Sequence, residues 1–259
     1  MPVTLPAHAA AILPLLNRRL RFLPPVALVV GSTAPDLAYL TGIYGTGSHT
    51  LPGLFTQAVP KGLLAYLWLE LLLLPMVRER LPAIGSLQLA RFTVTRGLPR
   101  SLRGWLAVLA ALSLGALTHL LWDGLTHVGW WPERHLFFGA RVTIAGQTLA
   151  VARVLWLVSS GVGSLIVLGY LARLYPRLTA PNPGPRGSAA PLVWALTLGV
   201  AFGLVWRTLF PSGYHSAWQV LWSYFWAATR YATVALTVLG LFDAWRRRRA
   251  RLQSTGPEM

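Results

Sequence analysis

The sequence contains no cysteine in its 259 residues. This absence excludes a disulfide framework, a thiolate nucleophile and a zinc site with cysteine ligands. Acidic residues are scarce as well, because aspartate and glutamate together number only seven. Any metal centre in this protein must therefore be built from histidine and a few carboxylates.

Charged residues of either sign are also few. They make up 12% of the chain, about half the share found in soluble proteins, while 54% of the residues are hydrophobic. This composition is typical of an integral membrane protein. Basic residues number 23, all arginine except Lys61, and give a formal charge of +16. Arginines just beyond apolar segments set topology and contact anionic headgroups, so we expect membrane lipids, and no nucleic acid, as partners.

Long apolar segments predict an all-α fold, a polytopic transmembrane helical bundle of about six spans. Five uninterrupted spans are expected at Leu51–Met76, Trp105–Trp131, Leu149–Leu171, Pro191–Phe210 and Val220–Trp245. A sixth, Leu23–Ile43, is interrupted by Gly31 and by Pro35 next to Asp36. Irregular backbone at membrane depth faces protein or a water-filled cavity, so this interruption indicates a site.

The N-terminal segment Leu5–Leu20 is apolar but too short to span a bilayer comfortably. Its arginines follow the apolar residues, whereas those of a signal peptide precede them. We therefore expect a retained re-entrant or half-membrane helix, in a hairpin with the next span through a turn at Arg18–Pro25. The expected organisation is one transmembrane domain over 1–251, with a metal-site half at 1–131, C-terminal spans at 149–245 and a disordered tail at 252–259.

Arginine clusters alternate along the chain with connections that hold few basic residues. The clusters lie at 18–21, 78–103, 173–186 and 246–251. By the positive-inside tendency these segments face the cytoplasm. The sequence thus predicts a cytoplasmic C-terminus.

His119, Asp123 and His127 occur at intervals of four residues in the motif GALTHLLWDGLTH. This spacing puts two imidazoles and a carboxylate on one face of an otherwise apolar helix. Ionisable groups at membrane depth are costly and normally line a cavity, a pathway or a metal site. A single such residue would more often be a hydrogen-bonded core group, but three at helical spacing favour metal ligation.

Helix geometry brings further residues to the same depth. His8 and Asp36 each lie 14 positions from Phe22 in the hairpin turn, and His119 lies 14 positions beyond Trp105. At 1.5 Å per residue, each rises about 21 Å from the cytoplasmic side. The sequence therefore predicts a cluster in the outer third of the bilayer. Its members are His8, Asp36, His49, His119 and Asp123, and His127 is expected nearer the outer membrane surface.

Four short motifs, PAHAAA, GSTAPDLAY, GSHTLPG and THLLWDGLTH, carry a resemblance that covers most of the chain. With the further spans that follow, the chain resembles an uncharacterised bacterial integral membrane family known only as a domain of unknown function. That family is similar to inner-membrane metal-dependent hydrolases and, more distantly, to zinc-dependent phospholipase C. The resemblance implies a bacterial inner-membrane location and a His/Asp metal centre that hydrolyses a phospholipid or similar ester. The residues that it carries over are His8, Asp36, His49, His119, Asp123 and His127.

The residues alone lead to similar chemistry. Several imidazoles with one or two carboxylates suit Zn²⁺ best, and Mn²⁺ or Fe²⁺ acceptably. The number of candidate ligands permits either one ion with an open water position or a pair of ions. A metal-activated water would be the nucleophile, with Asp36 or Asp123 as the catalytic general base where it is not a ligand. Arg230, in the middle of the last span, would bind a substrate phosphate or pair with a site carboxylate.

Two functions remain open at this point. The first is a metal-dependent membrane hydrolase that acts on a lipid-like ester or phosphoester. The alternative is a non-enzymatic membrane protein that binds or transports metal ions or protons through the same cluster. A transporter would carry ionisable groups through both halves of the membrane, whereas this cluster is confined to one, which favours the enzyme. Nothing in the sequence fixes an oligomeric state.

Overall fold

The computed structural model describes residues 5–16, 22–41, 47–80, 83–84, 87–88, 97–128, 131–136, 139–144, 146–178, 188–210, 213 and 216–254. The chain divides into two compact units. The first comprises residues 1–38, 43–66 and 99–175, and the second comprises residues 39–42, 67–98 and 176–259. The first unit contains every histidine and aspartate of the predicted cluster. The organisation as one transmembrane domain stays a prediction.

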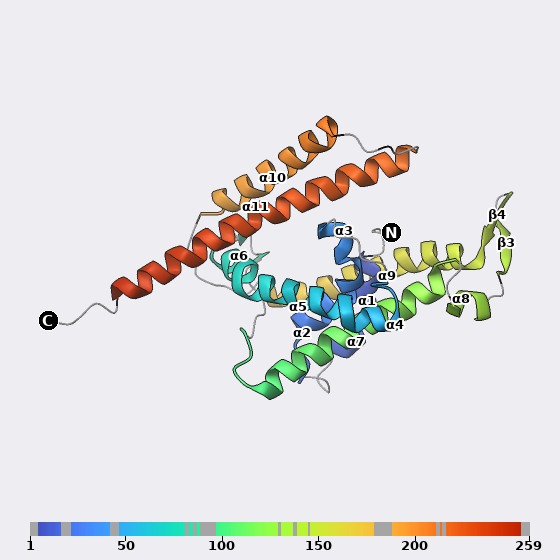
Figure 1. Ribbon diagram of the computed structural model, residues 1–259, viewed down its shortest axis with the longest axis horizontal. Coiled ribbons are helices and arrows are strands. Elements are labelled where there is room, and N and C mark those ends of the chain that lie inside the picture. The colour runs from blue at the N-terminus through green and yellow to red at the C-terminus, as the bar shows by residue number, and fades with distance from the viewer. Residues whose placement is uncertain are drawn as a thin grey trace. The chain divides into compact units, whose positions relative to one another are not determined.

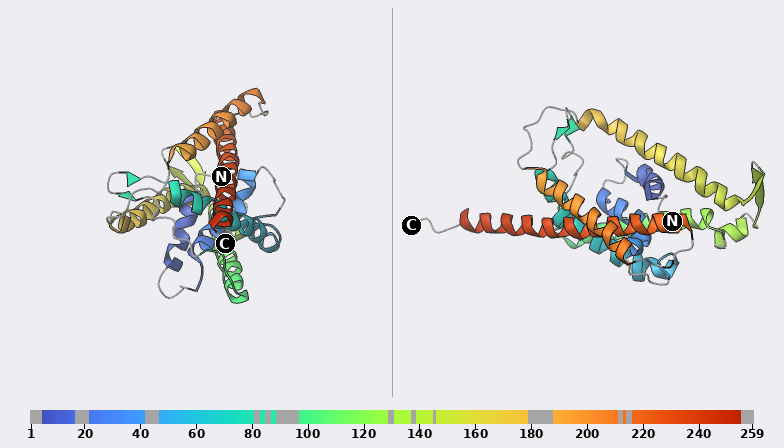
Figure 2. Two further views of the ribbon diagram at one scale, coloured as in Figure 1. Left: turned by 90° about the vertical axis from the view of Figure 1, so that its left-hand side faces the viewer. Right: turned by 90° about the horizontal axis from the view of Figure 1, so that it is seen from above.

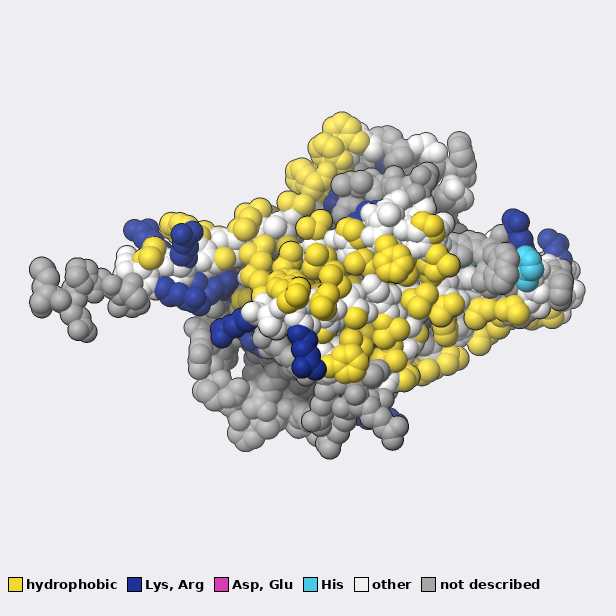
Figure 3. Space-filling view, turned by 60° about the horizontal axis from the view of Figure 1, so that its bottom comes forward, with side chains coloured by type: hydrophobic (Ala, Val, Ile, Leu, Met, Phe, Trp, Pro, Cys, Tyr) yellow, Lys and Arg dark blue, Asp and Glu magenta, His cyan; other side chains and the backbone are white. Residues whose placement is uncertain are grey.

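Five helices are long and apolar enough to cross a membrane, at Leu51–Arg78, Leu102–Thr126, Val151–Arg173, Ala190–Leu209 and Gln219–Gln253. They coincide with the five uninterrupted spans predicted above. Large hydrophobic side chains cover their outer surfaces, as at Leu165, which is 69% exposed. Figure 3 shows this apolar surface, with arginines gathered near the C-terminal end of the last helix. Extended apolar surface of this kind is suited to lipid, which indicates a membrane protein.

The predicted sixth span, Leu23–Ile43, is a shorter, interrupted helix. Helix α2 (Pro25–Thr33) begins with a proline in its first turn, where the missing N–H has no helical partner to lose. At Pro35 the missing N–H prevents the next α-helical bond, and the backbone tightens into a 3₁₀ turn over Ala34–Asp36. Helix α3 (Leu37–Thr41) follows. The interruption at Pro35 is therefore confirmed, while a sixth full crossing is not.

Gly31 does not break the helix, contrary to the prediction. It permits backbone contact between α2 and α7 (Leu102–Thr126), which lie against each other in Figure 1. A Cβ on Gly31 would overlap the carbonyl oxygen of Leu112, and a Cβ on Gly115 would lie 2.7 Å from the Ser32 nitrogen. Small residues let helix backbones approach closely in a membrane. The two glycines therefore let the middle of α7 pack directly against the end of α2.

Helix α1 (Leu5–Ile12) packs against both α2 and α7. It continues as a 3₁₀ turn over Leu13–Leu16, so the regular helix is shorter than the predicted Leu5–Leu20. The packing against α2 agrees with the expected hairpin, although Arg18, Arg19 and Arg21 lie outside the described residues.

The next helix is continuous and comprises α4 (Leu51–Gly53), a π-helical turn (Leu54–Ala58), α5 (Val59–Trp68), a second π-helical turn (Leu69–Leu73) and α6 (Leu74–Arg80). Thr50 caps its N-terminus, because its side-chain oxygen accepts the Gly53 N–H at 3.1 Å. The turn before this cap contains Gly47, whose φ of +104° favours glycine. His49 lies between Gly47 and Thr50, so the glycine turn and the helix cap together set its position.

An apolar core connects these segments beside the predicted site. Its fully or nearly fully buried members come from the 3₁₀ turn, the first π-helical turn and α7, and they are Ala34, Leu54, Ala58, Ala116 and Leu120. Between membrane helices such side chains stabilise mainly by close van der Waals packing, because lipid is as apolar as they are. The core therefore packs together the 3₁₀ turn and α7, which carry Asp36, His119 and Asp123, and the helix that follows His49.

Beyond α7, the predicted span Trp105–Trp131 extends too far. Helix α7 ends at Thr126, and a separate short helix, α8 (Trp131–Leu136), follows. Helix α9 (Val151–Leu178) then begins two residues later than the predicted start at Leu149.

The segment before α9 forms a β-hairpin that the all-α prediction missed. Strand β3 (Arg141–Ile144) pairs antiparallel with β4 (Gln147–Ala150), so that Ile144 lies opposite Gln147. Gly146, with a φ of +79°, lies in the connecting turn. Alternating Val and Ile around a glycine turn is a hairpin pattern, but a hydropathy window merges it with the next span.

In the second unit, α10 (Ala190–Leu209) and α11 (Ala217–Ser254) lie side by side (Figures 1 and 2). A Cβ on Gly203 would lie 2.7 Å from the Cα of Ala228, so glycine again allows close helix packing. The same unit contains a minimal antiparallel hairpin, β1 (Ala83–Ile84) with β2 (Leu87–Gln88).

Arg80 forms a buried bidentate ion pair with Asp243 of α11. Helix α11 extends to Ser254, so the first residues of the predicted disordered tail 252–259 are helical. The remaining residues of that tail lie outside the described ranges.

We expect Gly115→Ala to destabilise the protein by about 1–3 kcal/mol, because the new methyl group would overlap α2 backbone atoms that cannot rotate away. Thermal unfolding of detergent-purified protein measures this effect. Gly161→Ala in α9 is the matched control, since nothing lies within 4 Å of its Cβ position. Equal unfolding temperatures for the two variants would contradict the proposed role of the α2–α7 contact.

Candidate metal centre

Five of the predicted side chains come together in the first unit. They come from α1, from the 3₁₀ turn, from the turn before α4, and from two successive turns of α7, and they are His8, Asp36, His49, His119 and Asp123. All except His49 are buried, with no more than 5% of their surface exposed. Two overlapping groups have nitrogen or oxygen atoms within 4.8 Å of one another. The structure thus brings these residues together, while their role as metal ligands stays a prediction.

Asp123 occupies the middle of this cluster. Its Oδ1 lies 3.4 Å from His8 Nε2 and 3.4 Å from His127 Nδ1. Its Oδ2 lies 3.2 Å from His119 Nε2 and 3.6 Å from His49 Nε2. Each carboxylate oxygen therefore faces two imidazole nitrogens.

Asp36 faces two of the same imidazoles from the 3₁₀ turn. Its Oδ1 lies 3.2 Å from His49 Nε2 and 3.8 Å from His119 Nε2. On the other side of the His49 ring, Nδ1 lies 3.0 Å from Ser48 Oγ. The His49 ring is therefore held between a hydroxyl group and a carboxylate.

His119 is oriented by the backbone of α2. Its Nδ1 donates a hydrogen bond of 2.8 Å to the Ser32 carbonyl oxygen. Because a carbonyl oxygen can only accept, Nδ1 carries the proton and the lone pair of Nε2 faces the carboxylates. The ring also stacks on that of His8, with centroids 3.9 Å apart. This outer hydrogen bond is the kind that fixes histidine ligands in metal sites.

Buried polar atoms without hydrogen bonds gather in this cluster. Within the described part of the chain, both ring nitrogens of His8, Nε2 of His119 and Oδ1 of Asp123 are buried and form no hydrogen bond. Leaving such an atom unpaired costs on the order of 1–3 kcal/mol. Several unpaired atoms on three adjacent side chains make this cluster a candidate site for a cation, which would accept their lone pairs.

Distances between the nitrogen and oxygen atoms also suit a metal ion. Charge-assisted N–H···O⁻ hydrogen bonds are about 2.7–2.9 Å long. The imidazole–carboxylate distances here run from 3.2 Å to 3.8 Å. Two ligands about 2.0–2.1 Å from a tetrahedral zinc ion lie about 3.3 Å apart. Apart from the 3.2 Å hydrogen bond between His49 Nε2 and Asp36 Oδ1, the spacing therefore fits ligands of a shared ion better than directly hydrogen-bonded partners.

His127 lies at the edge of the cluster, and its backbone differs from the prediction. It follows the end of α7 with an extended conformation (φ −107°, ψ 125°), so it does not continue the helical face of His119 and Asp123. Its backbone N–H donates to the Asp123 carbonyl at 2.9 Å, which keeps the ring close to that carboxylate. Burial lowers the pKa of the His127 imidazole, against the opposing effect of Asp123. The neutral ring that burial favours is the form that binds metal.

Two groups that hold the cluster were absent from the predicted set. They are the Ser32 carbonyl oxygen and the Ser48 hydroxyl group, which contact His119 and His49. The position of Ser48 directly before His49 was the only available sequence signal. A backbone carbonyl leaves no signal in the residue type, so the contact from Ser32 could be found only from the fold.

Arg230, the predicted substrate-binding residue, belongs to the second unit. There its Nε donates to the Leu40 carbonyl oxygen at 3.1 Å. The geometry of the cluster does not test the substrate-binding role of Arg230, which stays a prediction.

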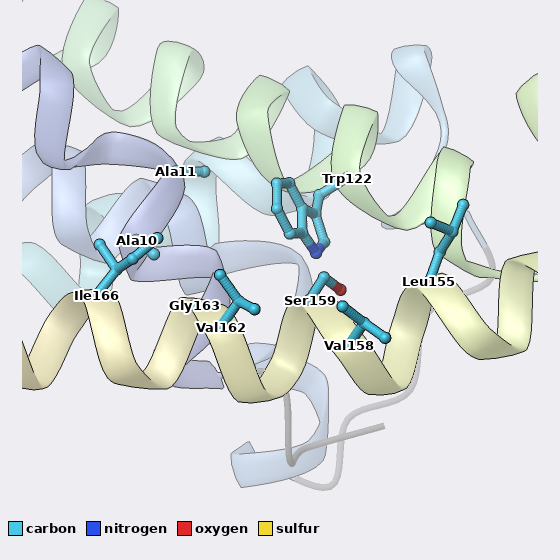
Figure 4. Close-up of a pocket in the computed structure, with 9 residues that line it drawn as sticks. All are labelled: Ala10, Ala11, Trp122, Leu155, Val158, Ser159, Val162, Gly163 and Ile166. Atoms are coloured by element: carbon cyan, nitrogen blue, oxygen red, sulfur yellow. The ribbon is translucent and has the colours of Figure 1, made fainter.

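A groove of about 350 Å³ lies between α1, α7 and α9 (Figure 4). Its lining is almost entirely apolar and includes Ala11, Trp122, Val158 and Val162. The Trp122 side chain lies across the groove from α9 in Figure 4, and its Nε1 is buried without a hydrogen bond. Trp122 adjoins Asp123, and Ala11 follows His8 by about one helical turn. The groove and the polar cluster therefore share two helices.

The long apolar helices and the buried His/Asp cluster together define a polytopic membrane protein with a candidate metal centre. The family described as Domain of unknown function (DUF4184) matches residues 1–242, and the chain belongs to this family. No curated protein and no solved structure matches the chain.

We expect His119→Ala and Asp123→Ala to lower the metal content of purified protein at least tenfold, because each removes a central nitrogen or oxygen donor. Elemental analysis after detergent purification measures the metal. His135→Ala is the control, since His135 is exposed on α8 and outside the cluster. Equally low metal in wild type and all variants would contradict the candidate site.

Proposed function

We propose that the protein is a metal-dependent membrane hydrolase that acts on a lipid-like ester or phosphoester. The observation that carries this proposal is the set of buried, unpaired nitrogen and oxygen atoms on His8, His119 and Asp123. A divalent ion bound through one ring nitrogen of His8, through His119 Nε2 and through Asp123 Oδ1 would pair most of these atoms. The mixture of imidazole and carboxylate suits Zn²⁺ best, with Mn²⁺ or Fe²⁺ as alternatives. A purely structural cluster would instead pair these atoms with one another by short hydrogen bonds.

His8, His119 and Asp123 would hold a divalent ion together with Asp36 and His49, and such an ion would supply polarisation of a scissile carbonyl or phosphoryl group and a water molecule of lowered pKa. The chain supplies the remaining functions. Asp123 faces four imidazoles and is best placed as a ligand. Asp36 approaches the imidazoles through Oδ1, so we assign its second oxygen as the general base that takes the proton of the attacking water.

The Ser32 carbonyl and the Ser48 hydroxyl preorganise the site. They hold the Nδ1 side of His119 and of His49, which directs Nε2 of both rings toward the carboxylates. Orientation by such outer contacts typically contributes 10–100-fold to metal affinity or activity. Rings fixed in this way need not reorient during a reaction.

The apolar groove supports an amphiphilic substrate. It is lined by Trp122, which directly precedes Asp123 in α7. Its volume of about 350 Å³ suits part of a hydrocarbon chain. An amphiphile bound there would keep its chain against Trp122 and α9 while its polar group reaches the His/Asp cluster. The substrate class that follows is a lipid-like molecule with a hydrolysable bond near its headgroup.

Metal or proton transport is less well supported. Between Arg103 and His119, α7 carries no ionisable residue. In that stretch Val108, Ala111 and Leu112 are fully buried. A pathway for metal ions or protons normally carries ionisable groups through both halves of the membrane, and this part of α7 has none.

We also propose that the protein lies in a bacterial inner membrane with the cluster toward the outer leaflet. The basic end of α7, at Arg103, is opposite to the end that carries Asp123. Helix α11 ends in exposed arginines, including Arg248 and Arg249. The positive-inside tendency supports a cytoplasmic location for both basic ends, and so for the C-terminus.

We expect the purified protein to hydrolyse short-chain ester or phosphodiester lipid analogues, and a chelator to abolish this turnover until Zn²⁺ or Mn²⁺ is restored. Asp36→Asn should lower kcat by about 10²–10⁴-fold, because the amide cannot accept the proton. Release of the polar product, measured by chromatography, tests this expectation. His135→Ala should retain wild-type turnover, and chelator-resistant turnover would contradict the metal-dependent mechanism.

We expect Val162→Trp to reduce turnover of long-chain substrates at least tenfold while changing turnover of short-chain substrates less than twofold, because the indole would fill the groove. Leu165→Trp is the matched control, since Leu165 lies on the same helix, 69% exposed and outside the groove. The ratio of kcat/KM values for the two chain lengths is the measurement. A parallel loss for both chain lengths would contradict the assigned role of the groove.

A further inference from the structure

The last helix carries a cluster of arginines that the proposed hydrolase does not use. Five of them, at positions 246–249 and 251, lie near the end of α11, where Figure 3 shows basic side chains beside apolar ones. Like charges three or four positions apart on a helix repel each other. The only acidic residue of α11 is Asp243, and both of its carboxylate oxygens accept hydrogen bonds from Arg80. The helix itself therefore supplies little negative charge to balance the cluster.

A hollow of about 320 Å³ lies along one face of α11 within this cluster. Its lining residues recur at intervals of three and four positions, so their side chains form one stripe along the helix. They are Phe242, Trp245, Arg246, Arg249, Ala250 and Gln253. The aromatic rings lie nearer the middle of the helix, and the arginines lie nearer its end. This order of apolar and cationic groups is complementary to an amphiphile with a negatively charged headgroup.

Both arginines of the hollow extend back over its aromatic rings. Arg246 Cζ lies 5.9 Å from the centroid of the Phe242 ring, and Arg249 Cζ lies 5.6 Å from that of the Trp245 ring. Side chains on a helix point toward its N-terminal end, and arginine is attracted to aromatic faces at this distance. Because the two arginines are three positions apart, their Cβ atoms lie about 5–6 Å from each other. One phosphate group can therefore contact both guanidinium groups.

The spacing of tryptophans along α11 gives the depth of this hollow in a bilayer. Trp222 and Trp245 are 23 positions apart, which corresponds to about 35 Å of helix at 1.5 Å per residue. The hydrocarbon core of a bilayer is about 30 Å thick, and tryptophan is enriched at both of its interfaces. When α11 crosses the core, Trp245 therefore lies at one interface. The guanidinium groups beside it then lie at the level of the lipid headgroups.

We propose that this hollow binds one anionic phospholipid, with its phosphate between Arg246 and Arg249 and an acyl chain along Phe242. Guanidinium groups recognise phosphate through paired, charge-assisted hydrogen bonds. A zwitterionic headgroup fits less well, because its cationic amine would face the same two arginines. The site lies on one helix of the second unit and requires neither a metal ion nor a residue of the His/Asp cluster. It therefore stands or falls independently of the proposed hydrolase.

The test titrates full-length protein in a non-ionic detergent with phosphatidylglycerol or phosphatidylcholine and counts bound lipids by native mass spectrometry. We expect wild type to bind the first phosphatidylglycerol at least tenfold more tightly than phosphatidylcholine. Combining Arg246→Gln with Arg249→Gln should lower the affinity for phosphatidylglycerol at least tenfold, because both phosphate contacts are lost.

The matched control combines Arg248→Gln with Arg251→Gln. It removes the same charge at the same spacing but outside the hollow, so phosphatidylglycerol affinity should fall less than threefold. All four arginines are exposed, and glutamine is a good helix former, so both double variants keep the helix folded.

Equal losses of affinity in the two double variants would overturn the site, because they would show attraction by the charge of the whole cluster. Equal affinity of wild type for the two lipids would overturn it as well. Glycerol 3-phosphate, which carries a phosphate without acyl chains, distinguishes a lipid from a free phosphate ester. Displacement of phosphatidylglycerol by an equal concentration of glycerol 3-phosphate would overturn the assignment to a lipid, whereas retention of the lipid would support it.

Discussion

The contact between the backbones of α2 and α7 is the constraint on which the site depends. Gly31 and Gly115 permit it, because a side chain at either position would overlap the facing helix. Ser32 follows Gly31 directly, and His119 follows Gly115 by about one turn. The same approach that packs the helices therefore brings the Ser32 carbonyl within 2.8 Å of His119 Nδ1. The close packing of α2 against α7 and the orientation of His119 therefore have the same geometric cause.

The buried cluster of imidazoles and carboxylates lowers the stability of the folded first unit. Buried polar atoms without partners each cost on the order of 1–3 kcal/mol, and the glycines forgo the apolar contacts that larger side chains would make. The apolar core of Ala34, Ala58 and Ala116 lies beside the cluster and holds the backbone against this cost. Bound cations would convert the unpaired atoms from a cost into a stabilising contribution, so metal binding and stability of the first unit are coupled.

Much of this arrangement follows from sequence, and the exceptions have identifiable causes. Hydropathy located the five long helices, and Pro35 marked a break because the missing N–H acts locally. Gly31 was misinterpreted as a break, since its role depends on what lies opposite in α7. The end of α7 at Thr126 and the β3–β4 hairpin were missed because both lie within or beside apolar segments where a hydropathy window stays high. The convergence of His8, Asp36 and His119 was predictable from equal helical rise, whereas the contact with Ser32 required the tertiary structure.

Neighbouring positions of α7 belong to the polar cluster and to the apolar groove. Asp123 faces the imidazoles, while Trp122, about 100° around the helix axis, lines the groove with Ala11 and α9. For the proposed amphiphilic substrate this division would be advantageous, because its chain would already lie in lipid and only its polar group would need to be positioned. The hydrocarbon chain of the substrate would then gain binding energy from shape complementarity with the groove. Removal of the chain from water would contribute little, since lipid is itself apolar. Discrimination among substrates should therefore depend mainly on the polar group, which is where the rigid, preorganised ligands are found.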